Sequence, residues 1–366
     1  MRVYLDWNST SPMLPRIQSE LAECWAQFGN PSSAHMEGRH ARVAIETARS
    51  MLASHLHALP DHIWFASSGS EINTQFIYSL VMKQYYSGLP QHLVISTIEH
   101  PCIMNAADWA EQMGVTVSRC PVDNRGLIQM DVLATLIRPE SLVSIMMVNN
   151  EVGVLQPVEA ISNLVRSEGG LFHSDVIQAV GKIPIDFNLF DMATLSPHKC
   201  GGPKGIAIGL CRTSEAIVPL IQGGGQEHGW RSGTESMPLI VAGAQAIEHA
   251  LQSPIDTQLQ PLKTRLETVL HQVGGHLIAP HSISSTVAAY FEGRQAASVV
   301  RRLDISGISI SAGSACSTGS IEPSHVGDAM GLPLAVQQGL FRMSMGWGSQ
   351  MRDIEFVEEC LKQWLT

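Results

Sequence analysis

Lys199 is the residue of this sequence whose setting most favours chemistry. It lies in the run SPHKCGGPKG (196–205), directly after a β-rich segment. A lysine that ends a strand and is flanked by glycines can reach a small molecule held close to the backbone. An isolated lysine is more often a solvated residue of a surface turn, so the interpretation depends on its partners.

A carboxylate stands at the end of another predicted strand. Asp175 closes the segment LFHSD (171–175) and is followed by VIQAV (176–180). Alone, such an aspartate is more often a helix cap. Lysine and aspartate together are the pair that pyridoxal phosphate needs, because the amine forms a Schiff base and the carboxylate holds the protonated pyridine nitrogen. The two residues therefore indicate a pyridoxal phosphate site.

Two further strand ends carry polar residues. The run FASSGSE (65–71) leaves a strand, turns at Gly69 and opens a helix, so its N–H groups and the Ser70 hydroxyl can bind a phosphate. The alternative is an ordinary serine N-cap. The run STIEHP (96–101) places His100 at a third strand end, where a hydrogen-bonded structural histidine is an equally good interpretation.

These residues need a scaffold that brings strand ends together. β-rich runs alternate with segments of helical period between about residues 60 and 212, which predicts an α/β fold with a mostly parallel sheet flanked by helices. Ligands of such sheets collect at the carboxyl ends of the strands. The predicted strands are 63–66, 92–97, 115–120, 142–148, 171–174, 192–195 and 206–211, and the predicted helices are 71–86, 102–113, 158–167, 238–251 and 258–273.

A second αβ section, from about residue 285 to the end, predicts a smaller α+β domain. We assign residues 13–254 to a large cofactor-binding domain, and residues 1–12 and 255–366 to the small domain, which carries the segment around Cys316.

The composition limits the classes of protein. The chain has 366 residues, 45% of them hydrophobic, so it can bury a large core and intrinsic disorder is excluded. A formal charge of −10 predicts no direct binding to nucleic acid. We find neither a signal peptide nor an apolar run long enough to span a membrane, which predicts a cytoplasmic protein.

The cysteines predict a reducing compartment and no metal site. Seven cysteines and 15 histidines occur without a CxxC pair or any other zinc-ligand spacing. Six of the cysteines are provisionally expected to be small buried hydrophobes. The seventh, Cys316, lies in SISAGSACSTGS (309–320), where small and polar residues predict a mobile loop.

Several motifs occur in an order that resembles one family. They are DWNSTSP (6–12), GNPSSAH (29–35), EHP (99–101), NNEVG (149–153), SPHK (196–199), RSGT (231–234) and SACS (314–317). Together they resemble the cysteine desulfurases, which are fold type I pyridoxal phosphate enzymes of the class V aminotransferase group. The resemblance covers nearly the whole chain.

The resemblance implies a role for each matched residue at the cofactor ring. Lys199 would form the Schiff base and later carry the α-proton of the substrate. Asp175 would hold the pyridine nitrogen, Gln178 the ring hydroxyl, and His100 would stack on the ring. Asn150 would approach both ring and substrate.

It also implies the residues that hold the phosphate and the substrate. The phosphate would be held by Gly69, Ser70, Ser196 and His198, and by Thr234 of the other subunit, which implies a homodimer with shared sites. The substrate would be held by Arg342, which would grip its carboxylate bidentately, together with Asn150 and Asn8.

The activity implied is the removal of sulfur from L-cysteine. Cys316, once deprotonated, would attack the substrate sulfur, giving L-alanine and a persulfide on Cys316. The persulfide would then pass to an acceptor protein, either an iron–sulfur scaffold or an enzyme of tRNA or DNA thiolation. The chain ends at Thr366, where many members carry more residues for scaffold docking, so an acceptor other than a scaffold is conceivable.

The sequence departs from the family pattern at four positions. Ser70 replaces a threonine of the phosphate-binding run. Near the start of the chain, Ser9 and Ser11 replace an alanine and a threonine, and Trp7 is unusually large, which leaves the shape of the substrate pocket open. Three alternatives also stay open. They are another pyridoxal phosphate enzyme such as a selenocysteine lyase or an aminotransferase, a cofactor-free binding protein of the same fold, and a zinc protein, which the ligand spacings disfavour.

Overall fold

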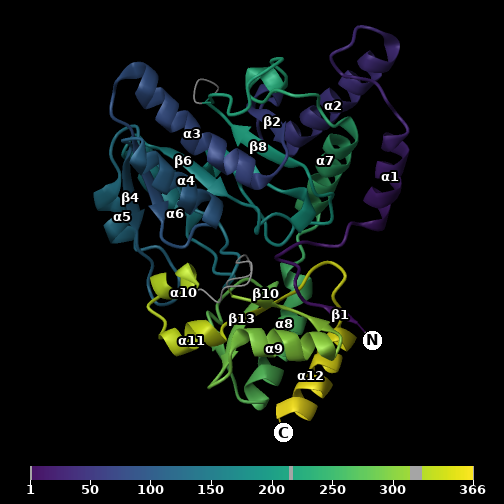
Figure 1. The fold of residues 1–366 in the computed structure, drawn as a ribbon, viewed down its shortest axis with the longest axis vertical. Coiled ribbons are helices and arrows are strands. Elements are labelled where there is room, and N and C mark those ends of the chain that lie inside the picture. The colour runs from purple at the N-terminus through teal and green to yellow at the C-terminus, as the bar shows by residue number, and fades with distance from the viewer. Residues whose placement is uncertain (1, 214–216, 314–323, 366) are drawn as a thin grey trace.

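A seven-stranded sheet forms the centre of the larger part of the molecule (Figure 1). The computed structural model describes residues 2–213, 217–313 and 324–365. The strand order is β2-β8-β7-β6-β5-β3-β4, and every neighbouring pair is parallel except the two pairs that β8 makes. The strands are β2 (Ile63–Ala66), β3 (His92–Ser96), β4 (Thr116–Cys120), β5 (Leu142–Ser144), β6 (Leu171–Asp175), β7 (Met192–Leu195) and β8 (Ala207–Cys211).

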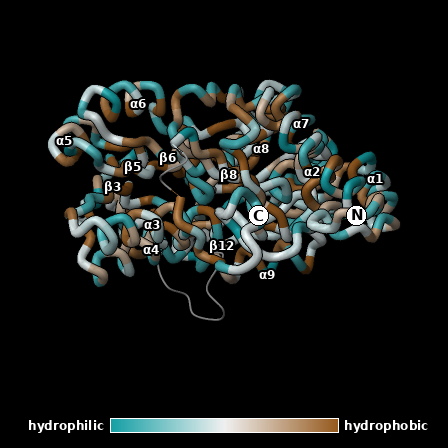
Figure 2. The backbone as a smooth tube through the Cα atoms, turned by 90° about the horizontal axis from the view of Figure 1, so that it is seen from above, coloured by the Kyte–Doolittle hydropathy of each residue, from teal (hydrophilic) through white to brown (hydrophobic). Residues whose placement is uncertain are grey.

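Helices cover both faces of this sheet (Figure 2). One face is covered by α3 (Gly69–Ser87) and α4 (Pro101–Gln112), and the other by α2 (Met36–His55), α5 (Met130–Leu136), α6 (Val158–Ser167) and α7 (Met237–Gln252). Helix α6 shows why these segments are helical. Its buried Val158, Ile161 and Val165 recur at helical spacing and form one apolar stripe against the sheet.

The predicted α/β class and the mostly parallel sheet are confirmed, and the strand bounds agree within one residue except in β5. Strand β5 ends at Ser144 and does not continue to residue 148. The Ile145 N–H still donates to His173 O at 3.1 Å and the Met147 N–H to Asp175 O at 3.0 Å. The apolar run after Ser144 therefore stays attached to β6 without forming regular strand.

A second apolar core lies beside a four-stranded antiparallel sheet of order β12-β13-β10-β9. This sheet comprises β9 (Gly275–Ile278), β10 (Thr286–Phe291), β12 (Ser311–Ala312) and β13 (Phe341–Ser344); β1 (Val3–Tyr4) pairs with β11 (Ile308–Ser309). The core joins Val3 and Leu5 to side chains of α8 (Asp256–Gln272), α9 (Ala296–Ile305) and α12 (Met351–Leu365). This grouping supports the domain division that we propose at residues 12 and 254.

The segment between β1 and α1 (Pro15–Trp25) links the two parts (Figure 1). Asp6 forms a bridge with Ser344 of β13, whereas the Ser11 N–H donates to His198 O at 2.8 Å, just beyond β7. The remaining helices are α10 (His325–Ala329) and α11 (Leu334–Gly339). No helix in the described part of the chain has the length and apolar character needed to cross a membrane.

Candidate active site

One cavity of about 580 Å³ lies at the carboxyl ends of β6 and β7 and collects most of the residues singled out in the sequence. The predicted residues that line it are Asn8, Gly69, Ser70, His100, Asn150, Asp175, Gln178, Ser196, His198, Lys199 and Arg342. Thr234 lies elsewhere, and Cys316 lies outside the described residues.

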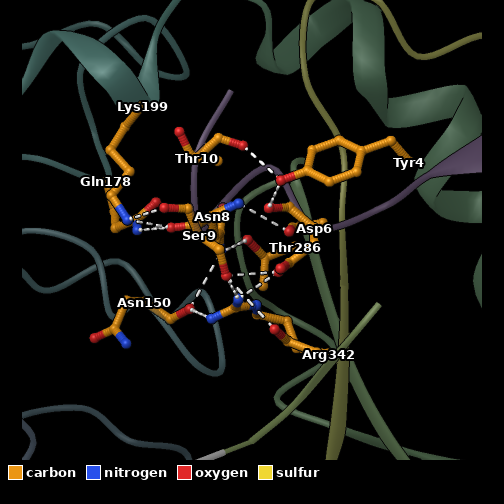
Figure 3. A network of polar contacts seen from close by, with 12 residues as sticks. Tyr4, Asp6, Asn8, Ser9, Thr10, Asn150, Gln178, Lys199, Thr286 and Arg342 are labelled. Atoms are coloured by element: carbon orange, nitrogen blue, oxygen red, sulfur yellow. Dashed lines mark hydrogen bonds and ion pairs between the residues drawn. The ribbon is translucent and has the colours of Figure 1, made fainter. Parts of the chain in front are cut away.

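Lys199 is positioned by a short 3₁₀ turn, Pro197–Lys199, that directly follows β7. Its Nζ donates to two backbone carbonyls of the N-terminal segment, Asn8 O at 2.6 Å and Ser9 O at 2.8 Å (Figure 3). The amine is therefore held at the cavity wall, where a bound molecule can meet it.

Asp175 ends β6 and is 5% exposed. Its carboxylate accepts from two neutral donors, the Ile177 N–H at 3.0 Å and Asn73 Nδ2 at 2.8 Å. Burial raises the pKa of this carboxyl group above its usual range. A buried carboxylate is stabilised by a cation, so the site suits a ligand that brings a protonated nitrogen to Asp175.

The N-terminus of α3 forms one end of the cavity. Ser68 caps the helix, because its hydroxyl accepts from the Glu71 N–H at 3.2 Å, so the N-cap interpretation of this run is correct. The first turn still presents N–H groups to the cavity at Gly69 and Ser70. A Cβ at Gly69 would lie 2.4 Å from Ile177 Cδ1, so a larger residue here would require the Ile177 side chain, just after β6, to move.

His198 lines the same cavity as the N-terminus of α3. Its Nδ1 lies 3.1 Å from Thr10 Oγ1, and burial lowers the pKa of His198 to about 4. The imidazole is therefore neutral at physiological pH and can exchange hydrogen bonds with an anion without supplying charge. Ser196 lies beside it in the same cavity wall and is 3% exposed.

His100 is the N-cap of α4, and Cys102 is its partner. His100 Nδ1 accepts from the Cys102 N–H at 3.2 Å and lies 3.1 Å from the Cys102 thiol. Burial lowers the pKa of His100, which favours the neutral ring. Because Nδ1 accepts a hydrogen bond, the proton of the neutral ring lies on Nε2. The expectation of six buried cysteines is correct for Cys120 and Cys211 and wrong for four others, which are only partly buried: Cys24, Cys102, Cys200 and Cys360. Of these four, Cys102 lines the cavity.

Arg342 projects from β13 and is 3% exposed (Figure 3). Its Nη2 donates to Asp6 Oδ1 at 2.7 Å and to Ser9 Oγ at 2.9 Å, and its Nη1 donates to Asn150 O at 2.7 Å. Its Nε is buried without a hydrogen-bond partner among the described residues. A buried guanidinium with a donor left over is suited to an anionic ligand.

Thr234 lies on a different hollow, of about 220 Å³, together with Ser67 and Arg231. Arg231 Nε lies 2.9 Å from Glu71 Oε1, in the first turn of α3. Thr234 therefore does not line the cavity of its own chain, and its predicted role depends on a second subunit.

The large Trp7 does not fill the cavity. It is 5% exposed, packs edge-on against Trp347 with ring centroids 5.6 Å apart, and lies so close to Gly346 that a Cβ there would be 2.1 Å from the Trp7 ring. Ser11 is structural as well, because its hydroxyl donates to His198 O and accepts from the Gly201 N–H. Of the unusual residues near the start, Ser9 does line the cavity.

Some residues of the site escaped the sequence analysis. Asn73 holds Asp175, Asp6 holds Arg342, and Lys182 lies buried behind Gln178. A polar residue inside an apolar run, as in VIQAVGKIPI (176–185), was the available signal for Lys182. Among the described residues, no group of three or more histidines, cysteines, aspartates or glutamates could hold a metal ion.

The fold and the cavity are those of a pyridoxal phosphate enzyme of fold type I. A model of the class V aminotransferase family matches residues 3–357. The chain belongs to this family, and its relatives lie in the cysteine desulfurase group. Over 376 aligned residues, it is 32% identical to the cysteine desulfurase IscS of Dictyoglomus turgidum, covering 99% of this chain and 94% of the relative.

Solved structures of the same group superpose closely. A NifS-like protein matches with a TM-score of 0.93 at 32% identity, over 100% of this chain and 99% of that one. SspA, solved in complex with cysteine, matches with a TM-score of 0.83 at 34% identity, over 94% of this chain and 99% of that one.

The residues of the cavity fit pyridoxal phosphate, the cofactor of this family. Lys199 supplies an amine, the buried carboxylate of Asp175 calls for a cation, and the N-terminus of α3 offers donors to a phosphate. These three features come from separate elements and converge on one cavity.

Proposed function

We propose that this protein is an L-cysteine desulfurase that converts L-cysteine to L-alanine and keeps the sulfur as a persulfide on Cys316. The observation that carries the proposal is the convergence of Lys199, Asp175 and Arg342 on one cavity. When bound there, pyridoxal phosphate supplies the electron sink for chemistry at the amino acid's α carbon. SspA, a relative by structure, was solved with cysteine.

Different residues of the chain would contact different parts of the cofactor. Lys199 would bind its aldehyde carbon and Asp175 its pyridine nitrogen, while Gln178 and His100 would contact the ring. Its phosphate would lie against Gly69, Ser70, Ser196 and His198. The positions of these residues around one cavity support the assignment.

Arg342 would hold the substrate carboxylate. Its Nη groups are already fixed by Asp6, Ser9 and Asn150, and its Nε is the buried donor left over. Asn8 and Asn150 line the same part of the cavity and would limit the room left for the substrate.

Cys316 would accept the sulfur. The thiol of Cys316 loses its proton, the carbon–sulfur bond of cysteine breaks, and a sulfur–sulfur bond forms on Cys316. The two electrons of the broken carbon–sulfur bond stay on the carbon, which takes up a proton in place of the one lost by Cys316 and becomes the methyl group of alanine. No external oxidant or reductant is consumed. Gly313 and Ser324, on either side of residues 314–323, both line the cavity, which supports this assignment.

We further propose a homodimer in which Thr234 completes the partner's phosphate site, a protein acceptor for the sulfur, and a cytoplasmic location. The position of Thr234 away from its own cavity supports the shared site. The acceptor would be an iron–sulfur scaffold or a thiolation enzyme.

The proposal is tested with the pyridoxal phosphate-loaded protein and L-cysteine. Alanine should form in the wild type and in the control Cys360→Ala, which lies in α12, and should fall to background in Cys316→Ala. Undiminished alanine and sulfide release by Cys316→Ala would mean that sulfur leaves by elimination and that the persulfide route is wrong. Release of selenium from L-selenocysteine, without release of sulfur from L-cysteine, would favour a selenocysteine lyase.

A further inference from the structure

A second lysine lies behind the cavity, buried and without a counter-ion. Lys182 is 3% exposed and lies four residues after Gln178, in a run of turns that follows β6. Its Nζ donates to Asn8 Oδ1 at 2.7 Å and to Gln178 Oε1 at 2.5 Å. In the described part of the chain, no carboxylate forms an ion pair with it.

The surroundings of Lys182 favour the uncharged amine. The titratable groups nearest to it are the cations Lys199 and Arg342 and the thiol of Cys200, and His249 lies across a small cavity of about 40 Å³ that Lys182 also lines. Burial in the first place, and then the two cations, lower the pKa of Lys182 well below its usual value. A neutral amine has two N–H groups, which matches its two acceptors.

Lys182 fixes the orientation of two amide groups that line the main cavity. Because the amide oxygens of Asn8 and Gln178 both accept from Lys182, their NH₂ groups must point elsewhere. Gln178 Nε2 donates to Asn8 O at 2.9 Å, and that carbonyl also accepts from Lys199 Nζ at 2.6 Å (Figure 3). Asn8 Nδ2 donates to Thr286 Oγ1 at 3.0 Å and to Asn150 O at 3.2 Å.

We propose that Lys182 is a positioning residue, a buried amine that orients the amides of Gln178 and Asn8 and thereby places Lys199. This inference rests on the proposed function, because Gln178 and Lys199 are there assigned to the cofactor. Lys182 acts through these residues and does not line the main cavity.

A comparison with the chain's other deeply buried lysine supports this role. Lys263 is also 3% exposed, but it has a carboxylate, Glu267 Oε1, 3.6 Å away, and donates to the carbonyls of Pro280 and Ser282. Through these two hydrogen bonds, Lys263 connects α8 to the loop that contains Pro280 and Ser282. Lys182 instead donates to two side chains of the catalytic cavity, which a purely structural lysine does not need.

The test compares Lys182→Met with the matched control Lys263→Met. Methionine keeps most of the length of the side chain and removes the donors. In Lys182→Met, we expect the dissociation constant of pyridoxal phosphate, measured on the apoprotein by equilibrium dialysis, to rise by about tenfold or more, because Gln178 and Asn8 are free to turn. In Lys263→Met it should change less than twofold.

Thermal stability gives a second readout, which should not fall when the affinity for pyridoxal phosphate falls. A base with a lowered pKa in the folded state binds more protons when unfolded, so Lys182 makes the wild type gain stability as the pH rises towards 10.5. The melting temperature of apo Lys182→Met should therefore equal or exceed that of the wild type near pH 7 and rise less between about pH 7 and 10. A residue with only a structural role would lower stability and affinity together.

The outcomes separate this inference from the proposed function. If Lys182→Met binds pyridoxal phosphate as tightly as the wild type does, the positioning role is wrong. If its melting temperature depends on pH as steeply as that of the wild type, Lys182 is not an uncharged amine in the folded protein. If Lys182→Met fails to fold, Lys182→Gln, which keeps an N–H donor, should retain more of the affinity than Lys182→Ala. Failure of the wild type to form alanine from L-cysteine would overturn the proposed function and leave these binding results standing.

Discussion

Asp6 Oδ1 lies 2.7 Å from Arg342 Nη2, although 336 residues separate the two in the chain. The contact joins the N-terminal segment to β13, and it lies on one side of the cavity while the carbonyls of Asn8 and Ser9 hold Lys199 on another. The same short segment therefore sets the positions of both the amine and the guanidinium (Figure 3).

Arg342→Lys should weaken substrate binding more than catalysis. Lysine keeps the charge but cannot span Asp6, Asn150 and a substrate carboxylate with one planar fork. We expect KM for L-cysteine to rise by about tenfold or more, with a smaller fall in kcat. Arg301→Lys, on the exposed side of α9, should leave both constants unchanged. An unaltered KM in Arg342→Lys would show that the carboxylate binds elsewhere.

Glu99→Gln should flatten the pH dependence of stability. Burial raises the pKa of Glu99 from 4.5 to about 8. The folded chain then keeps a proton that the unfolded chain releases, so the free energy of unfolding falls between those pH values, by up to about 1.4 kcal/mol per pH unit. Glutamine is neutral throughout and can still accept from Ser96 Oγ and the Met146 N–H.

The measurement is urea unfolding between about pH 5 and 8. The control is Glu359→Gln, which removes an exposed carboxylate from α12 and should follow the wild type. A slope in Glu99→Gln as steep as that of the wild type would mean that another group holds the proton.

Glu227→Gln should destabilise the fold strongly. Arg49 and Glu227 form a bidentate ion pair with both N–O distances at 2.9 Å, and their side chains are 1% and 2% exposed. The substitution leaves the buried guanidinium with Glu46 as its counter-ion, whose side chain is 40% exposed and lies 3.1 Å from Arg49 Nε. Loss of the buried partner of such a pair costs up to about 3–5 kcal/mol. Asp304→Asn removes one partner of the exposed Arg2–Asp304 pair and should leave the melting temperature nearly unchanged. Equal losses in both variants would contradict this account.

Thr234→Ala and Lys199→Ala chains should complement each other when mixed. If Thr234 serves the partner's cavity, one of the two cavities of a mixed dimer has both residues intact. Random mixing at limiting pyridoxal phosphate should then restore about a quarter of wild-type activity, whereas either variant alone stays far below that level. No recovery in dimers shown to be mixed would place Thr234 at its own cavity or outside any site.

The parts of the site that follow strand ends could be predicted from the sequence. Asp175 and Lys199 meet because β6 and β7 are parallel neighbours and their carboxyl ends lie together. Glycine and serine at the start of α3 also follow from local turn and capping chemistry.

The supporting contacts could not be predicted, because they depend on long-range packing. The carbonyls that hold Lys199 come from residues about 190 positions away, and the sequence does not show which backbone carbonyls will accept from it. The position of Trp7 against Gly346 likewise required the fold. The apolar run around Lys182 was a signal that it is buried, but only the fold shows that it contacts the amides of Asn8 and Gln178.

The most direct test of the proposed function is to locate the sulfur after one addition of L-cysteine without reductant. The pyridoxal phosphate-loaded protein is alkylated and digested, and the peptide that contains Cys316 is weighed by mass spectrometry. The account predicts that this peptide carries one extra sulfur atom, in an amount equal to the alanine formed, and that peptides with Cys102 or Cys360 carry none. Alanine accompanied by an equal amount of free sulfide, with Cys316 unmodified, would contradict it.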